Sequence, residues 1–110
     1  MPNYLVQVSY RQEGWKALVS NPQNRVDALR PVVERLGGKV QGAWFAFGDY
    51  DIVLILEVGD NVSAAALAMA AAAGGSVQSI KTTPLLSLAE AVEAMKKAGT
   101  SGYRAVSASS

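Results

Sequence analysis

The short polar segment Gly48-Asp49-Tyr50-Asp51 lies between two apolar runs and places a phenol beside a carboxylate. Asp51 has two interpretations. In the first, burial at an interface between protomers raises its pKa, and it acts as a base or holds a ligand. In the second, it begins a strand and bonds its own hairpin or an amide of a partner chain. A carboxylate without a second titratable partner is a weak basis for catalysis, so we favour the second interpretation and assign no catalytic residue.

Three aromatic residues are further candidates for contact with a ligand. Tyr50 either donates a phenolic hydrogen bond to a ligand or pairs with an aromatic ring across the hairpin. Trp44 either stacks on an aromatic ligand or anchors a dimer. Tyr4, and with it Tyr10 on the same strand face, either lines a pocket beneath an alanine-rich helix or belongs to the core. These three residues and Asp51 are the candidate ligand-binding residues.

The composition excludes several kinds of chemistry. The chain has 110 residues, ten of them basic and nine acidic, and contains neither Cys nor His. Its own side chains therefore cannot form a disulfide, a thiolate nucleophile, an imidazole base or a zinc site with soft ligands. The acidic residues Asp49, Asp51, Glu57 and Asp60 are poorly spaced to converge on a metal. We expect no metal and no cofactor.

The pattern of charge and hydropathy argues against nucleic acid or a membrane as partner. The basic residues form no stripe with interleaved aromatics, as a nucleic-acid binder normally has. The longest stretch of low charge, 62–75, is too short to span a bilayer and is mostly Ala. The opening Met-Pro-Asn-Tyr lacks the basic start and apolar stretch of a signal peptide. We therefore expect a cytoplasmic protein whose partner is a copy of itself.

Apolar periodicity predicts the elements that position these residues. They are a strand at 4–10, a helix capped at Asn21-Pro22 and ended by Gly37-Gly38, two strands at 40–47 and 52–58, an alanine-rich helix from Asp60 or Asn61 to Ala73, a strand at 77–83 and a helix after Ser87. This β-α-β-β-α-β order, followed by a helix, predicts an α+β protein of the ferredoxin-like type. We expect one domain over residues 1–98, with the first and third strands at the centre of the sheet. Residues 99–110 are rich in Gly, Ser and Ala and are expected to be a disordered tail.

The hairpin is expected to be tight. Gly48-Asp49 reads as a two-residue loop, because Gly adopts the positive φ that such turns require. In that register Phe47 opposes Tyr50 and Phe45 opposes Ile52. Phe45 and Phe47 then lie on the core face, whereas the other face of the sheet is mixed in character.

With this order of elements, the chain resembles the GYD-domain family, which is named for a Gly-x-Tyr-Asp signature at this hairpin. The matching residues are Gly48, Tyr50 and Asp51, and the similarity extends over about residues 2–98. The resemblance implies a dimeric α+β barrel, in which two such sheets face each other. Relatives of that architecture include cofactor-independent monooxygenases, muconolactone-type isomerases and haem enzymes. The haem enzymes generally use a proximal His, which this chain lacks.

Three kinds of function remain open. A sheet face with Trp44, Val53 and Ile55 uncovered by helices favours a homodimer that binds a small apolar or aromatic molecule or serves as an assembly module. The alternative is a cofactor-independent monooxygenase- or isomerase-like enzyme, in which Trp44, Tyr50 and Asp51 position the substrate. A third class is regulatory amino-acid binding between protomers of a larger oligomer. An enzyme needs an enclosed cavity of about 300 Å³ or more with converging polar groups, whereas an assembly module has a filled interior.

Overall fold

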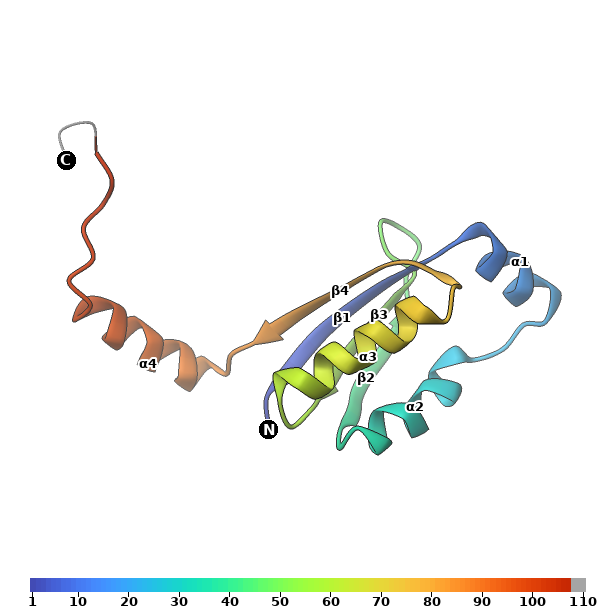
Figure 1. Cartoon of the computed structure of the whole chain (residues 1–110), viewed down its shortest axis with the longest axis horizontal. Helices are drawn as coiled ribbons and strands as arrows, with labels where there is room; N and C mark the ends of the chain where they lie inside the picture. The colour runs from blue at the N-terminus through green and yellow to red at the C-terminus, as the bar shows by residue number, and fades with distance from the viewer. Residues whose placement is uncertain (108–110) are drawn as a thin grey trace.

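The computed structural model describes residues 1–107 and has one sheet with helices on one face (Figure 1). Its elements are β1 (Asn3–Tyr10), α1 (Gln12–Ser20), α2 (Arg25–Arg35), β2 (Lys39–Phe45), β3 (Ile52–Glu57), α3 (Asn61–Ala73), β4 (Val77–Leu85) and α4 (Leu88–Gly99). The strand order is β2-β3-β1-β4, and neighbouring strands are antiparallel. This arrangement confirms the predicted α+β, ferredoxin-like fold with β1 and β3 at the centre.

The core lies between the sheet and the helices α2 and α3. Alternate residues of β1 pair with alternate residues of β3, so Tyr4 faces Leu56, Val6 faces Leu54 and Val8 faces Ile52. All six side chains are buried. The helices add four further buried residues, namely Val26, Val33, Ala64 and Leu67. The period-two pattern of β1 therefore decides which sheet face the helices cover.

The helix ends agree with the sequence in two places and differ in one. The Asp60 carboxylate caps α3 by accepting a hydrogen bond from the Ser63 amide (2.7 Å), and Ser87 with Glu90 forms the predicted capping box of α4. The predicted cap at Asn21-Pro22 is wrong. The Asn24 side chain accepts from the Val26 amide (3.0 Å) and begins α2, whereas Asn21 follows the end of α1.

The predicted two-residue hairpin loop is also wrong. Phe45 does oppose Ile52, as expected, but residues 46–51 connect the strands. Phe45 is 49% exposed and Phe47 is fully exposed, so neither belongs to the core. The φ of Gly48 is not positive. The physical reason lies in Asp51, whose amide donates to the Val8 carbonyl of β1 (2.8 Å) while its own carbonyl accepts from Ala46 (2.8 Å). Asp51 is thus hydrogen-bonded to the strand on either side of it, and the residues that precede it, 47–50, form a wider loop.

One face of the sheet and the last helix have no covering layer. On the open face, Leu5, Val53 and Ile55 are half-buried, and Trp44 is 59% exposed. Figure 1 shows α4 standing away from the sheet and the other helices. The Cα radius of gyration is 18.0 Å, compared with about 13 Å for a compact chain of this length. α4 therefore forms an arm that its own domain does not cover.

The remaining expectations about the chain concern its ends and membranes. Within residues 1–107, no helix is both long and apolar enough to cross a bilayer. The predicted disordered tail includes residues 108–110, which lie outside the described residues. The domain boundary at residue 98 stays a prediction.

Candidate functional site

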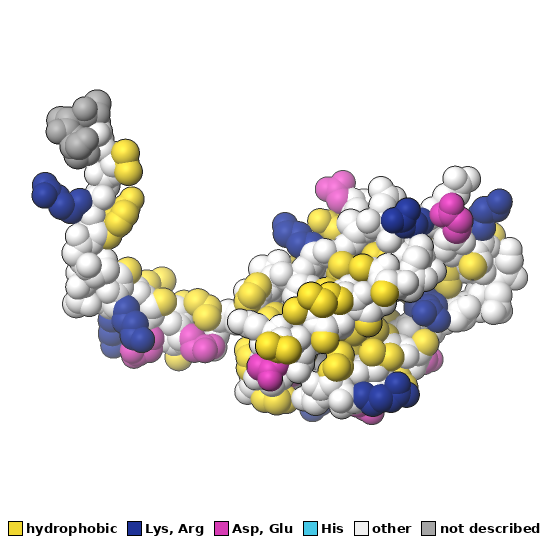
Figure 2. Space-filling model, in the orientation of Figure 1, with side chains coloured by type: hydrophobic (Ala, Val, Ile, Leu, Met, Phe, Trp, Pro, Cys, Tyr) yellow, Lys and Arg dark blue, Asp and Glu magenta, His cyan; other side chains and the backbone are white. Residues whose placement is uncertain are grey.

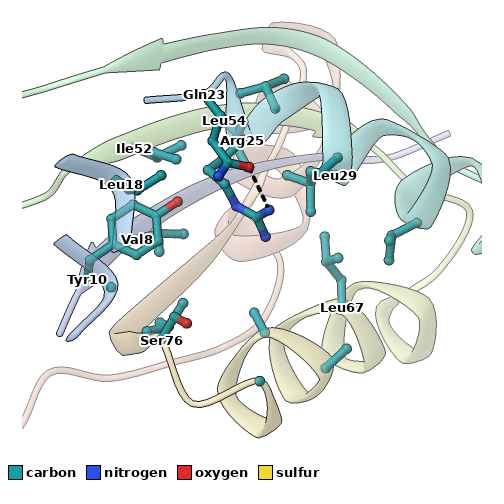
Figure 3. A pocket seen from close by; sticks show the side chains of 18 of the residues that line it. Val8, Tyr10, Leu18, Gln23, Arg25, Leu29, Ile52, Leu54, Leu67 and Ser76 are labelled. Atoms are coloured by element: carbon teal, nitrogen blue, oxygen red, sulfur yellow. Dashed lines mark hydrogen bonds between the residues drawn. The ribbon is translucent and has the colours of Figure 1, made fainter. Parts of the chain in front are cut away.

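A cavity of about 460 Å³ lies between the covered face of the sheet and the helices (Figure 3). Its walls are mostly apolar. The sheet contributes Val8, Ile52, Leu54 and Val77, and the helices contribute Leu29 and Leu67. This cavity is open to solvent on one side and lies against the buried centre of the sheet, so a molecule that enters it contacts apolar side chains of the core.

Small side chains explain why this space is open. At the end of α3 the cavity is lined by Ala70, Ala71 and the following Gly74, and Ala17 of α1 and Ala28 of α2 also line it. A methyl group reaches too short a distance from the helix backbone to fill the gap between neighbouring elements, so the space persists. Ala is also the strongest helix former, which lets α3 remain a helix without large side chains. Figure 2 shows hydrophobic side chains gathered on the helical face around α3, with few charges among them.

The cavity has a small set of polar groups, namely Tyr10, Gln23, Arg25 and Ser76. Figure 3 shows the Tyr10 ring and the Arg25 side chain converging, with Leu67 across the cavity from them. The Arg25 guanidinium donates to the Gln23 amide oxygen (3.4 Å). Burial raises the pKa of the Tyr10 phenol above 10.0, the Arg25 guanidinium partly offsets this rise, and the charge of Asp51 adds to it. Tyr10 is therefore a neutral hydrogen-bond donor at ordinary pH.

Tyr10 is held in place from three sides. Its backbone amide donates to the Asp51 carboxylate (2.8 Å), at the point where the β1–β4 register shifts. Its ring meets the Trp15 ring edge-on at a centroid distance of 5.6 Å. A Cβ atom on Gly14 would lie 2.9 Å from the Ser76 carbonyl oxygen and 3.3 Å from Tyr10 Cδ1, so α1 approaches this closely only because residue 14 is Gly. The Asp51 carboxylate thus orients a residue of the cavity without lining it.

The structure does not bring the four candidate ligand-binding residues together. Tyr4 is buried in the core, and its hydroxyl donates to the Asn61 side chain (2.6 Å). Trp44 lies on the open sheet face with its ring over Gly42, and it lines a second, more open pocket of about 410 Å³ between the β2 edge and α2. Tyr50 is half-buried in the hairpin loop. None of these residues or Asp51 lines the cavity, and their role in ligand binding stays a prediction.

Sequence reasoning found Tyr10 as a pocket candidate but missed Gln23 and Arg25. The sequence contained no signal for Arg25. With the cap predicted at Asn21-Pro22, Arg25 falls inside the helix rather than at its first position, where a cation is unfavourable. Among residues 1–107, no three His, Cys, Asp or Glu side chains are grouped so that they could hold a metal ion.

Comparison with known proteins identifies a family. The family model of the GYD domain matches residues 4–95, which is most of the chain. Comparisons with curated proteins and with solved structures each gave no match. The match includes the Gly48–Asp51 signature, the sheet that Asp51 joins and the cavity above that sheet. The chain therefore belongs to the GYD-domain family.

Proposed function

We propose that this protein binds a small, largely apolar molecule in the cavity between the sheet and its helices. The observation that carries the proposal is the cavity itself, at about 460 Å³ with apolar walls and converging polar groups. Binding sites for small molecules commonly have volumes of about 300–1,000 Å³ and this composition. A protein that served only as an assembly module would gain stability by filling this space, because packing lost around a void is costly.

The binding proposal is tested with a neutral apolar dye, Nile red, whose fluorescence rises in apolar surroundings. Ala71 lines the cavity, whereas its neighbour Ala72 is exposed and does not. We expect the wild type and Ala72→Phe to bind the dye in solution, and Ala71→Phe to bind it at least about tenfold more weakly, because the new ring occupies the cavity. Equal binding by both variants, with melting temperatures close to that of the wild type, would contradict the proposal.

The second part of the proposal is a homodimer in which a second copy covers the open sheet face. The centre of that face carries Leu5, Val53 and Ile55, and exposed apolar patches of this kind usually mark an interface. The arm α4 presents Leu88, Val92 and Met95 to solvent and has no buried residue of its own. A second copy would supply a surface for both.

The dimer is tested by molar mass from light scattering at micromolar concentration. Val53→Lys places a charge at the centre of the open face, whereas Val62→Lys makes the same change at an exposed position of α3. We expect the mass of a dimer for the wild type and Val62→Lys and the mass of a monomer for Val53→Lys, since an unpaired charge buried at an interface costs about 3–5 kcal/mol, a loss of more than about 100-fold in affinity. A monomeric wild type would contradict this part of the proposal.

In the alternative of a cofactor-independent enzyme, three residues position the substrate. Trp44, Tyr50 and Asp51, which that alternative used to position a substrate, lie outside the cavity. Within the cavity, the polar groups available are suited to holding a ligand, and no observation favours a reaction over binding.

A further inference from the structure

Deepening the proposed function, on which this inference rests, we propose that the cavity selects molecules with a single carboxylate and an apolar body. The carboxylate would be held by Arg25 and Tyr10, and the body would lie against the sheet and α3. Two features of the described structure support the choice of an anion, and one supports the apolar body.

The first feature is an arginine without an acidic partner. Within residues 1–107 the ion pair formed is Lys96 with Glu93 on α4, far from the cavity in the fold. Arg25 instead bonds the neutral amide of Gln23 and faces the neutral phenol of Tyr10. A guanidinium presents its donors in a planar fork that matches a carboxylate, and such charge-assisted bonds are stronger than those to neutral groups. Arg25 is an exposed residue of the cavity lining, and its guanidinium donors are available to a carboxylate on a molecule that enters the cavity.

The second feature is the position of this charge at the start of α2. The N-terminus of α2, which the Asn24 side chain caps, carries a partial positive charge that Arg25 reinforces and an anion would offset. The nearby acidic groups are already occupied or turned to solvent. Asp51 accepts from the Tyr10 amide, and Asp27 in the first turn of α2 is exposed. The Tyr10 hydroxyl, which is protonated at pH 7, can add a second donor.

The rest of the cavity favours an apolar body of modest size. Beyond Tyr10 and Arg25 the lining runs along Val8 and Leu54 of the sheet to Leu67 of α3 (Figure 3). A second charged group on the ligand would meet these side chains and lose its hydration without compensation. A single anionic group at one end of a hydrocarbon or aromatic skeleton fits the whole lining.

The test compares two probes of nearly the same shape, the anion of 2-naphthoic acid and the neutral 2-naphthamide, by isothermal titration calorimetry at pH 7. We expect the wild type to bind the acid about 10- to 100-fold more tightly than the amide. Arg25→Gln should remove most of that preference while binding of the amide is unchanged. Arg35→Gln makes the same change in the last turn of the same helix and outside the cavity, and should behave as the wild type. Tyr10→Phe should reduce the preference in part.

The outcomes separate this inference from the proposed function. Equal affinity for the acid and the amide, or a preference that survives Arg25→Gln, would overturn the carboxylate inference and leave binding in the cavity intact. An equal loss in Arg25→Gln and Arg35→Gln would also overturn it, because the effect would then reflect overall charge. If neither probe binds the wild type at millimolar concentration and Nile red binds Ala71→Phe as well as it binds the wild type, the proposed function fails and the inference fails with it.

Discussion

The signature carboxylate is expected to stabilise the fold rather than to contact a ligand, and Asp51→Ala tests this directly. The Asp51 carboxylate accepts from the Tyr10 amide at 2.8 Å in a partly buried position. Removing it leaves that amide without its partner at a register shift of the sheet, which costs about 1–3 kcal/mol. Asp51→Asn retains an acceptor oxygen but loses the charge, so we expect about half of that loss or less.

These losses are measurable by thermal unfolding at one fixed protein concentration. For a domain of this size, 1 kcal/mol corresponds to about 4 °C, so Asp51→Ala should melt about 4–12 °C below the wild type. Asp49→Ala is the matched control, because Asp49 is exposed in the same loop and should change stability by less than about 0.5 kcal/mol. A wild-type melting temperature for Asp51→Ala, or an equal drop for Asp49→Ala, would refute this role for the carboxylate.

Three further changes test other parts of the structure. Leu56→Ala removes a side chain that is 1% exposed and should destabilise by about 2–5 kcal/mol in urea unfolding, whereas Leu86→Ala, at 63% exposed, should have little effect. Gly14→Ala should destabilise by about 1–3 kcal/mol because its Cβ would lie 2.9 Å from a backbone oxygen, unlike Gly99→Ala, where nothing lies within 4 Å. Because burial raises the pKa of Tyr10 above 10.0, its contribution to stability is full below pH 10 and is lost as pH rises through the raised value, so Tyr10→Phe should lose less stability than the wild type above pH 10. Equal alkaline loss in the two proteins would contradict this assignment.

The sequence predicted the architecture well because the relevant signals are local. The alternation of apolar residues in β1 indicates a strand buried on one face, and the continuous apolar run of β3 indicates a strand at the centre of the sheet. The extent to which a strand is buried depends on its position in the sheet. The Asp60 cap and the Ser87 capping box likewise depend on residues at most three positions apart. Such patterns are readable without knowing the rest of the fold.

The errors share one cause, which is contact between distant segments. The hairpin loop is wide because the Asp51 amide bonds to Val8, a residue 43 positions earlier. The cavity joins Tyr10, Arg25 and Leu67 from three elements, and nothing in the local sequence around Arg25 indicates that its side chain turns towards β1. The sequence prediction selected Trp44 and Tyr50 because aromatic side chains often contact ligands, but both residues lie outside the cavity.

The most direct test of small-molecule binding in the cavity is an amide and methyl chemical-shift titration of the labelled protein with 2-naphthoic acid. We predict saturable shifts at residues that line the cavity, above all Tyr10, Arg25 and Leu67, with Trp44 and Tyr50 unaffected. Shifts centred on Trp44 and Tyr50, with the cavity residues unchanged, would contradict the account and place the site on the open sheet face or the hairpin.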